Sequence, residues 1–484
     1  MLARRDTLDR IHYFSRFGIT EGLLRDTLAA ALSSGGDRAD VFVQHRVMSS
    51  LGLEDGEVNR AYAGVSLGAG VRVVKGDQQG YAFTEELTRE SLLNAAKTAA
   101  VVASGPSRMA PEAFRVSDLP KRYPLQRPWE DVRTEEKLPL LQGLNTSAFA
   151  RDPRIKKVSV SFADESGAVL IADSSGRISE DLQPMSRIGL SCTAEQGGQR
   201  ESNGWNLAGR TGFDWFSPER MERLVDRAVE KTTILFDAIQ PPAGEMPVVL
   251  GAGSSGILLH EAIGHGMEAD FNRKGTSIFS DKLNQKVAQD FVSIVDDGTQ
   301  DFARGAINVD DEGNEVGKTM LVEGGTLSSY LHDSISARHY GVKPTGSGRR
   351  ESYQHAPQPR MRSTYMLPGP HKRDEIVASV KRGIFCDSFS NGQVNIGPGD
   401  FTFYVTNGWL IEDGKLTQPV KDVNIIGNGP KVLSLIDMVG DDLIIDEGGW
   451  TCGKNGQSVP VSQGMPTVRV SSLTVGGRGV KKAS

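Results

Sequence analysis

Cysteine is scarce in this chain of 484 residues, which has three, and no CxxC pair occurs. Cys192, Cys386 and Cys452 are too few and too far apart to form a disulfide framework. Free thiols persist in reducing compartments, so the composition predicts a cytoplasmic protein. The N-terminal segment MLARRDTLDRIHYF has Arg4 and Arg5 but no apolar stretch after them, and we therefore expect no export signal.

Long hydrophobic runs and blocks of like charge are also missing. The uncharged run Met246–Leu259 spans 14 residues and contains three glycines, well short of the ~20 residues that cross a bilayer. Lys and Arg number 55 against 61 Asp and Glu, a net charge of −6, with both signs spread along the chain. We therefore expect neither a nucleic-acid nor a membrane partner, and the net charge offers acidic substrates no attraction.

Glycine is abundant: 55 of 484 residues, or 11.4%, against a usual ~7%. This favours many turns and tight backbone passages over a helical bundle. The hydrophobic fraction of 38% suffices for real cores, and the length corresponds to about three domains. We predict an N-terminal module at residues 1–104, a Pro-rich linker at 105–130, a central module at 131–240 and a C-terminal domain at 241–484.

The first two modules repeat one order of elements: a helix, antiparallel strands and a second helix. Apolar residues that recur on one helical face predict helices at 20–32, 88–102, 135–149 and 218–236. Strands are predicted at 39–46, 51–54, 57–62, 68–74 and 81–83, and again at 157–163, 168–172, 177–182 and 187–194. Two helix and antiparallel-sheet modules of similar plan are the expected result.

Beyond residue 240 the composition shifts toward Gly, Asn, Asp and short strands. Strands are predicted at 247–250, 319–322, 401–409, 431–438 and 467–473. Few helices alternate with these strands, so we expect a β-rich C-terminal domain without parallel winding. The predicted fold class is α+β.

The segment GAGSSGILLHEAIGHGMEAD, residues 251–270, allows two incompatible interpretations. Gly251, Gly253 and Gly256 follow a predicted strand with the GxGxxG spacing of dinucleotide-binding sites. In a chain this rich in glycine the pattern arises by chance about 0.7 times, and the acidic residue expected at the end of a second strand is missing. A dinucleotide-binding oxidoreductase is therefore the weaker alternative.

His260, Glu261 and His265 form a much rarer pattern, which chance produces about 0.02 times in such a chain. Two imidazoles are good zinc ligands, and a carboxylate beside the first can act as general base toward a water molecule. The pattern favours zinc-dependent hydrolysis. A pair of helix histidines held by ordinary hydrogen bonds is the other interpretation.

The spacing of the two histidines predicts a distorted helix. On a regular helix, residues five apart differ in direction by about 140°, against about 40° for residues four apart. His260 and His265 could share a metal only if the turn contained an extra residue, as in a π-bulge, or if the helix unwound. Gly264 and Gly266 flank the second histidine and lower the cost of such a distortion.

Zinc in a catalytic site needs a third protein ligand and an open position for water. Glu268, Asp270, other histidines and the cysteines are candidates. Cys452 stands in the glycine-rich segment GGWTCGKNGQ, where Lys454 would favour a thiolate. A buried, packed thiol and a nucleophile with a histidine base are the alternatives for Cys452.

The segment from 338 to 362 is rich in hydrogen-bond donors that could line a cleft or stabilise an oxyanion. The candidate substrate-binding residues are His339, Tyr340, Arg349, Arg350, His355 and Arg360. A solvated loop would carry the same residues, so this role is a hypothesis for each of them.

The chain resembles the TldD/PmbA family of metallopeptidases, specifically its TldD branch, in HEAIGHGMEADFNRKGTSIFSDKLNQKVA, RHYG, TGSGRRESYQHAPQPRMRSTY and the loop around Cys452. ADVFVQ, LEDGEV and GAGVRVV near the N-terminus extend the resemblance over almost the whole chain. The resemblance implies that His260, His265 and Cys452 hold zinc and that Glu261 is the catalytic carboxylate.

The resemblance also implies partners. Such subunits pair with a related TldE (PmbA) subunit that lacks the metal motif, which implies a dimer with an enclosed active-site cavity. The implied substrates are peptides or unfolded polypeptide segments, bound largely through their backbone. A non-catalytic regulatory or adaptor protein remains a third class to be distinguished by experiment.

Overall fold

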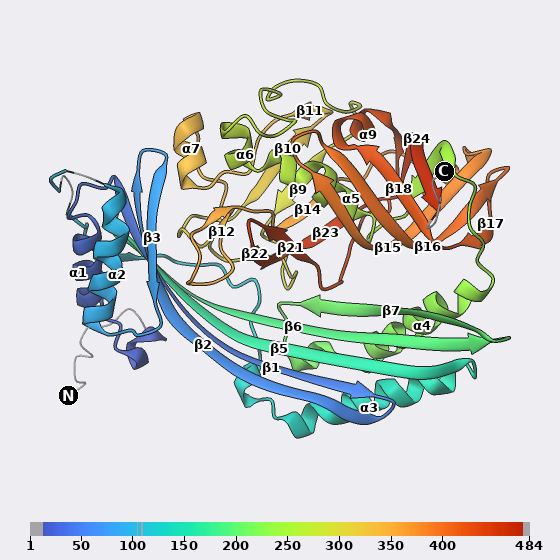
Figure 1. Ribbon diagram of the computed structural model, residues 1–484, viewed down its shortest axis with the longest axis horizontal. Coiled ribbons are helices and arrows are strands. Elements are labelled where there is room, and N and C mark those ends of the chain that lie inside the picture. Colours follow the sequence, from blue (N-terminus) through green and yellow to red (C-terminus); the bar gives the residue numbers. More distant parts are fainter. Residues whose placement is uncertain (1–12, 104, 108–109, 478–484) are drawn as a thin grey trace, which may run out of the picture.

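The computed structural model describes residues 13–103, 105–107 and 110–477, and shows a curved sheet flanked by helices and facing a β-rich half (Figure 1). The α-helices of the N-terminal half are α1 (Glu21–Ala31), α2 (Arg89–Ala99), α3 (Thr134–Arg151) and α4 (Pro218–Thr233). Side-chain oxygens of Thr20, Thr88 and Ser217 accept backbone N–H groups of the first turns of α1, α2 and α4. The predicted helices are confirmed, and among the described helices none has both the length and the apolar composition needed to cross a membrane.

One sheet joins the two N-terminal modules. Its strands are β1 (Arg38–Glu54), β2 (Glu57–Lys75), β3 (Gln78–Thr84), β4 (Arg115–Val116), β5 (Ile155–Asp173), β6 (Arg177–Gln196) and β7 (Gln199–Gly209). They lie in the order β3-β2-β1-β5-β6-β4, with β7 also beside β6. β1 and β5 pair antiparallel from Asp40 opposite Asp173 to Glu54 opposite Ser159. The α+β fold class is therefore confirmed, with both modules built on one shared sheet.

The strands are longer than the sequence predicts. The segments 39–46 and 51–54 form a single strand, β1, and the predicted strand pairs of β2, β5 and β6 merge in the same way. The predicted breaks fall where apolar and polar side chains cease to alternate, as at Ser49 and Ser50. There β1 still pairs with β2 on one side and with β5 on the other. Pairing on both sides satisfies the backbone groups whatever the side chains are, so the strand continues.

Each end of the curved sheet has its own hydrophobic core. α1 and α2 cover the end that includes Val43 of β1, and α3 and α4 cover the end that includes Leu53. Phe42, on the opposite face of β1, packs with Val309 and Tyr353 of the C-terminal half. Because side chains alternate between the two faces of a strand, β1 contributes to the helix-covered cores and also contacts the C-terminal half.

The C-terminal half is β-rich, as predicted, and has two main sheets. The first contains β8 (Gly244–Leu250), β15 (Arg382–Asn395), β16 (Asp400–Glu412), β17 (Lys415–Val420), β18 (Val423–Asn428), β19 (Ile436–Val439) and β24 (Val468–Gly477). Its order is β15-β8-β24-β18-β16-β17, with β19 on β24, and a further pairing of β15 with β16 closes the sheet on itself. The second runs β11 (Thr326–Leu327), β10 (Lys318–Glu323), β9 (Ile294–Asp297), β14 (Ser363–Met366), β23 (Ser462–Met465), β20 (Ile444–Ile445).

The predicted strand at 431–438 is wrong in its first part. That part is the helix α9 (Gly429–Leu435), and only β19 after it is a strand. Pro430 stands in the first turn of α9, where its missing N–H has no helical partner to lose. A short apolar run such as Val432-Leu433 does not by periodicity alone distinguish a helix from a strand, which explains the error.

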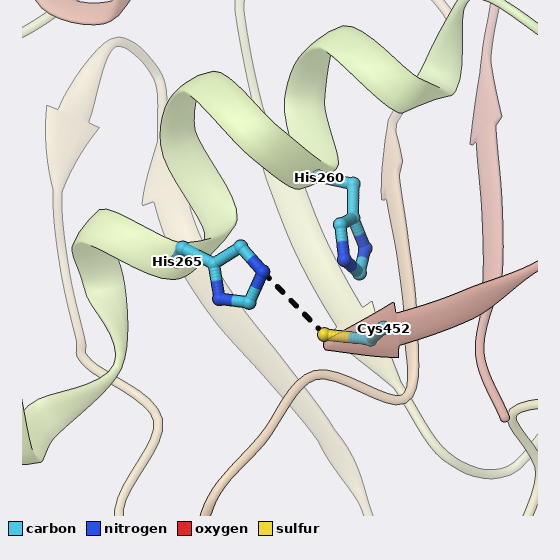
Figure 2. Close-up of side chains that lie close together, drawn as sticks. All are labelled: His260, His265 and Cys452. Atoms are coloured by element: carbon cyan, nitrogen blue, oxygen red, sulfur yellow. Dashed lines mark hydrogen bonds between the residues drawn. The ribbon is translucent and has the colours of Figure 1, made fainter. Parts of the chain in front are cut away.

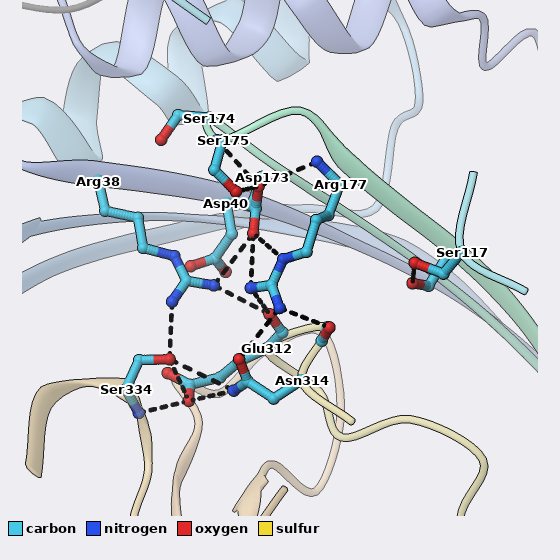
Figure 3. Close-up of polar contacts among 12 residues, drawn as sticks. Arg38, Asp40, Ser117, Asp173, Ser174, Ser175, Arg177, Glu312, Asn314 and Ser334 are labelled. Atoms are coloured by element: carbon cyan, nitrogen blue, oxygen red, sulfur yellow. Dashed lines mark hydrogen bonds and ion pairs between the residues drawn. The ribbon is translucent and has the colours of Figure 1, made fainter. Parts of the chain in front are cut away.

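Buried ion pairs join the curved sheet to the C-terminal half. Figure 3 shows the neighbouring contacts that Arg38 and Arg177 make with the loop of Glu312. Arg72 of β2 pairs with Asp40 of β1 and with Glu312, at 2.7 Å each, and all three side chains are fully buried. Arg38 and Arg177 donate hydrogen bonds to backbone carbonyls of the loop that carries Glu312. Burial alone would raise the pKa of Glu312, but the charges of Arg72 and Arg38 outweigh it and lower that pKa to about 2.

We expect Arg72→Met to destabilise the protein by about 3–5 kcal/mol, because it leaves Glu312 buried without its ion-pair partner and leaves Asp40 with Arg350 alone. Urea unfolding followed by circular dichroism measures the change. Arg89→Met is the matched control: it breaks the exposed pair with Asp26, which contributes about 0–1 kcal/mol. Equal unfolding midpoints for the two variants would contradict the structural role assigned to Arg72.

Candidate metal centre

The chain after β8 forms a helix whose geometry changes twice within twelve residues. An α-helical turn, α5 (Gly256–Leu259), leads into a π-helical turn, His260–Gly264, and then into a 3-10 turn, His265–Met267. The backbone N–H of His265 donates to the carbonyl of His260, the five-residue hydrogen bond of a π-helix. The predicted distortion is confirmed, and it places the two histidines one turn apart.

The glycines in this turn have a different role from the one expected. Gly264 has ordinary right-handed helical angles, φ −58° and ψ −49°, so it does not supply an unusual backbone conformation. A Cβ on Gly264 would lie 2.0 Å from Met361 Sδ, and one on Gly266 would lie 2.6 Å from the ring of Phe279. These glycines therefore allow close packing around the distorted helix.

His260 and His265 meet Cys452, which lies on the hairpin of β21 (Thr451–Lys454) and β22 (Gln457–Pro460) (Figure 2). One potential ligand atom from each of the three side chains lies within 4.8 Å of the other two, and all three side chains are buried. The two imidazole rings are nearly perpendicular, with centroids 5.1 Å apart. No other group of three or more such side chains occurs in the part of the chain that the structure describes.

The arrangement fits zinc. Cys452 Sγ and His265 Nε2 are 3.5 Å apart, and zinc bonded to a sulfur at about 2.3 Å and to a nitrogen at about 2.0–2.1 Å in tetrahedral geometry separates them by about 3.5 Å. Nδ1 of His260 is buried without a hydrogen-bond partner among the described residues. Two imidazoles and one thiolate leave the fourth tetrahedral position open, as in catalytic zinc sites.

Charged side chains next to the candidate metal ligands fix the positions of His265 and of the strand that carries Cys452. Glu268 accepts a hydrogen bond from Nδ1 of His265 at 2.9 Å, and Lys454 lies 3.1 Å from the same carboxylate oxygen. Lys454 also pairs with Asp270 at 2.7 Å. Because Lys454 and Cys452 belong to the same strand, the ion pair with Glu268 holds that strand beside His265.

The electrostatics favour an ionised site. Burial would raise the pKa of the Cys452 thiol, but the charges of His260 and His265 outweigh burial and hold that pKa well below its ordinary value. Burial likewise would raise the pKa of Glu268, yet Lys454 and His265 lower it to about 2. Cys452 therefore has the thiolate character that binds metal, whereas burial raises the pKa of Cys192 to about 12.

Glu261 follows His260 in the same π-helical turn. Its side chain is half-buried and makes no hydrogen bond or ion pair with any residue in the described ranges. The other acids considered as ligands, Glu268 and Asp270, lie outside the group of three donors and instead bind His265 and Lys454. Glu261 is thus the carboxylate of this turn that is not already engaged.

Two of the arginines predicted as substrate-binding residues lie behind the Cys452 hairpin. Arg360 donates to the carbonyls of Cys452 and Gln457, at 2.5 and 3.2 Å. Arg349 donates to the carbonyls of Met361 and Pro460, at 2.6 and 2.7 Å. Both side chains are buried, and their hydrogen bonds fix the hairpin that carries the thiol.

The other four candidates contact different parts of the molecule. His339 and Tyr340 end helix α7 (Ser334–Tyr340); His339 lies 3.8 Å from Asp77, and Tyr340 packs against Tyr330 and His332. Arg350 lies over the ring of Phe42 and donates to Asp40, and His355 bonds Ser352. A role of these residues in substrate binding stays a prediction.

The GxGxxG glycines serve packing rather than a nucleotide. A Cβ on Gly256 would lie 2.6 Å from the backbone nitrogen of Gly464 in β23, and one on Gly251 would lie 2.8 Å from the ring of Phe385. The helix that Gly256 begins has four residues before the π-helical turn. The parallel βαβ unit of a dinucleotide site is not formed here, and the oxidoreductase alternative is not favoured.

The hydrogen bond between Glu268 and His265 was not predicted, because Glu268 was considered only as a candidate metal ligand. A detectable signal exists, because a carboxylate three residues after a helical histidine lies close to its imidazole. The contact between Arg360 and the carbonyl of Cys452 has no such local signal, since the two residues are 92 positions apart.

Three family models match the chain, and together they span most of it. They are described as PmbA/TldA metallopeptidase domain 1, at residues 39–103, the central domain, at 127–236, and the C-terminal domain, at 243–477. The curated protein "Metalloprotease TldD homolog" of Haemophilus influenzae is 41% identical, covering 91% of this chain and 93% of its own. "Zinc metalloprotease TldD homolog" of Saccharolobus solfataricus is 28% identical, covering 86% and 91%.

The fold agrees with these matches. The crystal structure of TldE from Thermococcus kodakarensis superposes with a TM-score of 0.74 at 18% identity, covering 94% of this chain and 99% of its own. At that identity the likeness shows the fold alone, while the family models and the 41% identical relative establish the kinship. This chain belongs to the TldD/PmbA family of metallopeptidases.

Proposed function

We propose that this protein is a zinc-dependent peptidase in which His260, His265 and Cys452 hold the metal and Glu261 is the general base. The observation that carries the proposal is the meeting of two imidazoles and a thiol of lowered pKa at one buried point. The family kinship and the name of the zinc metalloprotease from Saccharolobus solfataricus support the choice of zinc and of peptide hydrolysis.

Glu261 would move the proton in the reaction. When bound, zinc supplies Lewis acidity, which polarises a carbonyl and lowers the pKa of water. The carboxylate of Glu261 would accept the proton of the attacking water and then deliver it to the leaving amide nitrogen. Its position beside His260 and its lack of a partner among the described residues support this role.

The substrates we propose are peptides or unfolded polypeptide segments that enter an enclosed active-site cavity. We propose that the protein acts in the cytoplasm. We further propose a dimer with a related TldE-type subunit, supported by the kinship with the TldD homologues. If the substrate binds as an added strand at an exposed sheet edge, the protein recognises mainly the substrate's backbone. We therefore expect little preference for particular substrate sequences.

Metal analysis of the purified protein beside His260→Ala tests the proposal. We expect about one zinc per chain in the wild type and less than about 0.1 in the variant after dialysis against a chelator. A fluorescent unfolded polypeptide should be cleaved much faster than the same protein folded, and chelation should abolish cleavage until zinc is restored. A wild type that binds no zinc, or that cleaves both forms at the same rate, would count against it.

We expect Glu268→Gln to weaken zinc binding about 10–100-fold, because the carboxylate that orients His265 and attracts Lys454 loses its charge. Titration against a chromophoric chelator measures the affinity directly. Asp270→Asn is the matched control: Lys454 keeps its pair with Glu268, so the affinity should change less than about threefold. Equal zinc affinities of the wild type and Glu268→Gln would contradict the role of Glu268 in orienting His265.

A further inference from the structure

A cavity of about 250 Å³ lies between the curved sheet and the C-terminal half, beside the hairpin that carries Cys452. Its walls come from β1, β5 and β6 on one side and from Thr451 and Ser458–Pro460 of the hairpin on the other. Five arginines line it: Arg46, Arg210, Arg304, Arg349 and Arg350. The concentration of cations here contrasts with the net charge of −6 of the whole chain.

Arg210 forms no ion pair with any residue that the structure describes, although the carboxylates of Asp181 and Asp311 attract it at longer range. It follows the last residue of β7 and is 3% exposed. Its guanidinium lies over the ring of Tyr123, 5.2 Å from the centroid, and makes no hydrogen bond or ion pair with any residue that the structure describes. A buried cation without a partner is costly, so such a group in a cavity wall indicates a site for an anion.

Two neighbouring arginines also lack a carboxylate partner. Arg304 donates to the carbonyl of Trp450 and the hydroxyl of Thr451, and Arg349 donates only to backbone carbonyls. Burial, together with the charges of Arg187 and Arg210, lowers the pKa of Arg304 to about 10. Among the described residues, neither guanidinium lies within 4.0 Å of a carboxylate oxygen.

Of the acids that line the cavity, Glu165 alone forms an ion pair with one of these arginines among the described residues. Glu165 pairs with Arg46 at 2.5 Å, and Arg350 pairs with Asp40 outside the cavity wall. Asp311 and Glu351 accept backbone N–H groups, of Arg350 and Ser458, and form no ion pair within the described residues. Arg210, Arg304 and Arg349 therefore have no ion-pair partner among the described residues, and only longer-range attraction from Asp311 and Asp181 acts on Arg210.

We propose that this cavity binds one carboxylate group of a peptide substrate, with Arg210 and Arg304 as the groups that receive it. Three arginines without an ion-pair partner among the described residues suit an anion, and the volume is below the ~300–1,000 Å³ of sites that enclose a larger ligand such as a nucleotide. Arginine also suits carboxylates because its planar fork can donate two parallel hydrogen bonds.

The location suits a subsite of the proposed peptidase, on which this inference rests. Arg304 bonds Thr451, the residue before Cys452, and Arg349 donates to the carbonyl of Pro460 at the end of the same hairpin. A peptide whose carboxylate reaches this cavity would therefore extend along the hairpin that bears the metal ligand. The carboxylate can be the C-terminus of the substrate or an acidic side chain, and the experiment separates these two sources.

Peptide binding to the zinc-loaded Glu261→Gln chain tests the proposal without requiring turnover. The probes are fluorescein-labelled pentaalanine with a free C-terminus, the same peptide as its C-terminal amide, and Ala-Ala-Ala-Ala-Glu amide, measured by anisotropy. We expect at least one of the two carboxylate-bearing peptides to bind about tenfold more tightly than the neutral amide. Tighter binding of the free acid alone would identify the C-terminal carboxylate as the ligand. Tighter binding of the glutamate peptide alone would identify an acidic side chain as the ligand.

Arg210→Gln, introduced into the same chain, should abolish that advantage and leave the affinity for the neutral amide unchanged. Arg210→Lys keeps the positive charge and should retain part of the affinity advantage of the carboxylate-bearing peptides. Arg89→Gln removes an exposed arginine of α2 and should retain the full affinity advantage of the carboxylate-bearing peptides. The inference is overturned if the three peptides bind alike or not at all, if the advantage survives in Arg210→Gln, or if that variant weakens all three equally.

The two proposals can fail separately. A wild type that cleaves peptides but shows no preference for a carboxylate would refute the subsite and leave the peptidase standing. A chain that prefers the carboxylate but cleaves nothing after zinc loading would refute the peptidase and leave the subsite standing.

Discussion

Glu261→Gln is expected to lower kcat/KM for peptide cleavage by about 100- to 10,000-fold while zinc content and fold are retained. The amide has nearly the shape of the carboxylate but cannot accept the proton of the attacking water. Because Glu261 makes no hydrogen bond or ion pair within the described part of the chain, its replacement should not disturb other contacts. Steady-state kinetics on a fluorogenic peptide measure the loss.

The control for this variant is Glu323→Gln, which makes the same chemical change at an exposed position of β10. Its activity and zinc content should equal those of the wild type. Should Glu261→Gln retain more than about a tenth of the activity, proton transfer must be assigned to another group. A loss of activity that accompanies a loss of zinc would instead point to a structural role.

Cys452→Ser is expected to remove zinc and activity together. A serine hydroxyl is a much weaker zinc ligand than a thiolate, and two imidazoles alone leave the ion open to exchange. We expect the zinc content to fall from about one per chain to less than about 0.1 after dialysis against a chelator. The thermal stabilisation that zinc gives to the wild type should disappear as well, since a ligand stabilises only the state that binds it.

Cys192→Ala is the matched control for the thiol. Cys192 is fully buried in the core beneath α3 and α4, away from the candidate metal centre, so its loss should cost little stability and no zinc. If both Cys452→Ser and Cys192→Ala retained zinc, the thiol of Cys452 would contribute only to packing. Another residue would then have to be the third zinc ligand.

Local patterns predicted the helices of the N-terminal half and the distorted turn well, whereas α9 was mistaken for a strand. The five-residue spacing of His260 and His265 admits a shared metal only through an extra residue in the turn, and the hydrogen bond between their backbones has that geometry. The lengths of the strands were harder to predict, because β1 continues through Ser49 and Ser50 by pairing with β2 and with β5, and the partners in β5 are more than 100 residues away. Side-chain alternation contains no information on such partners.

The grouping of arginines around one cavity could not be predicted from the sequence, although Arg349 and Arg350 had been singled out as hydrogen-bond donors. Arg46, Arg210, Arg304 and Arg349 are spread over about 300 positions and share no motif. Their ion-pair partners are decided by the three-dimensional arrangement: Arg46 pairs with Glu165, whereas Arg210 forms no ion pair among the described residues. The substrate roles suggested for His339, Tyr340, Arg350 and His355 remain predictions that mutagenesis has to decide.

The separation of the metal donors along the chain bears on how the protein is made. Cys452 follows His265 by 187 residues, so both histidines leave the ribosome long before the thiol is synthesised. With zinc held as proposed, a growing chain has no complete metal site while it and its neighbours are still unfolded and open to cleavage. Peptidase activity would then arise only after translation has passed the hairpin and that hairpin has docked, which protects nascent polypeptides from self-digestion.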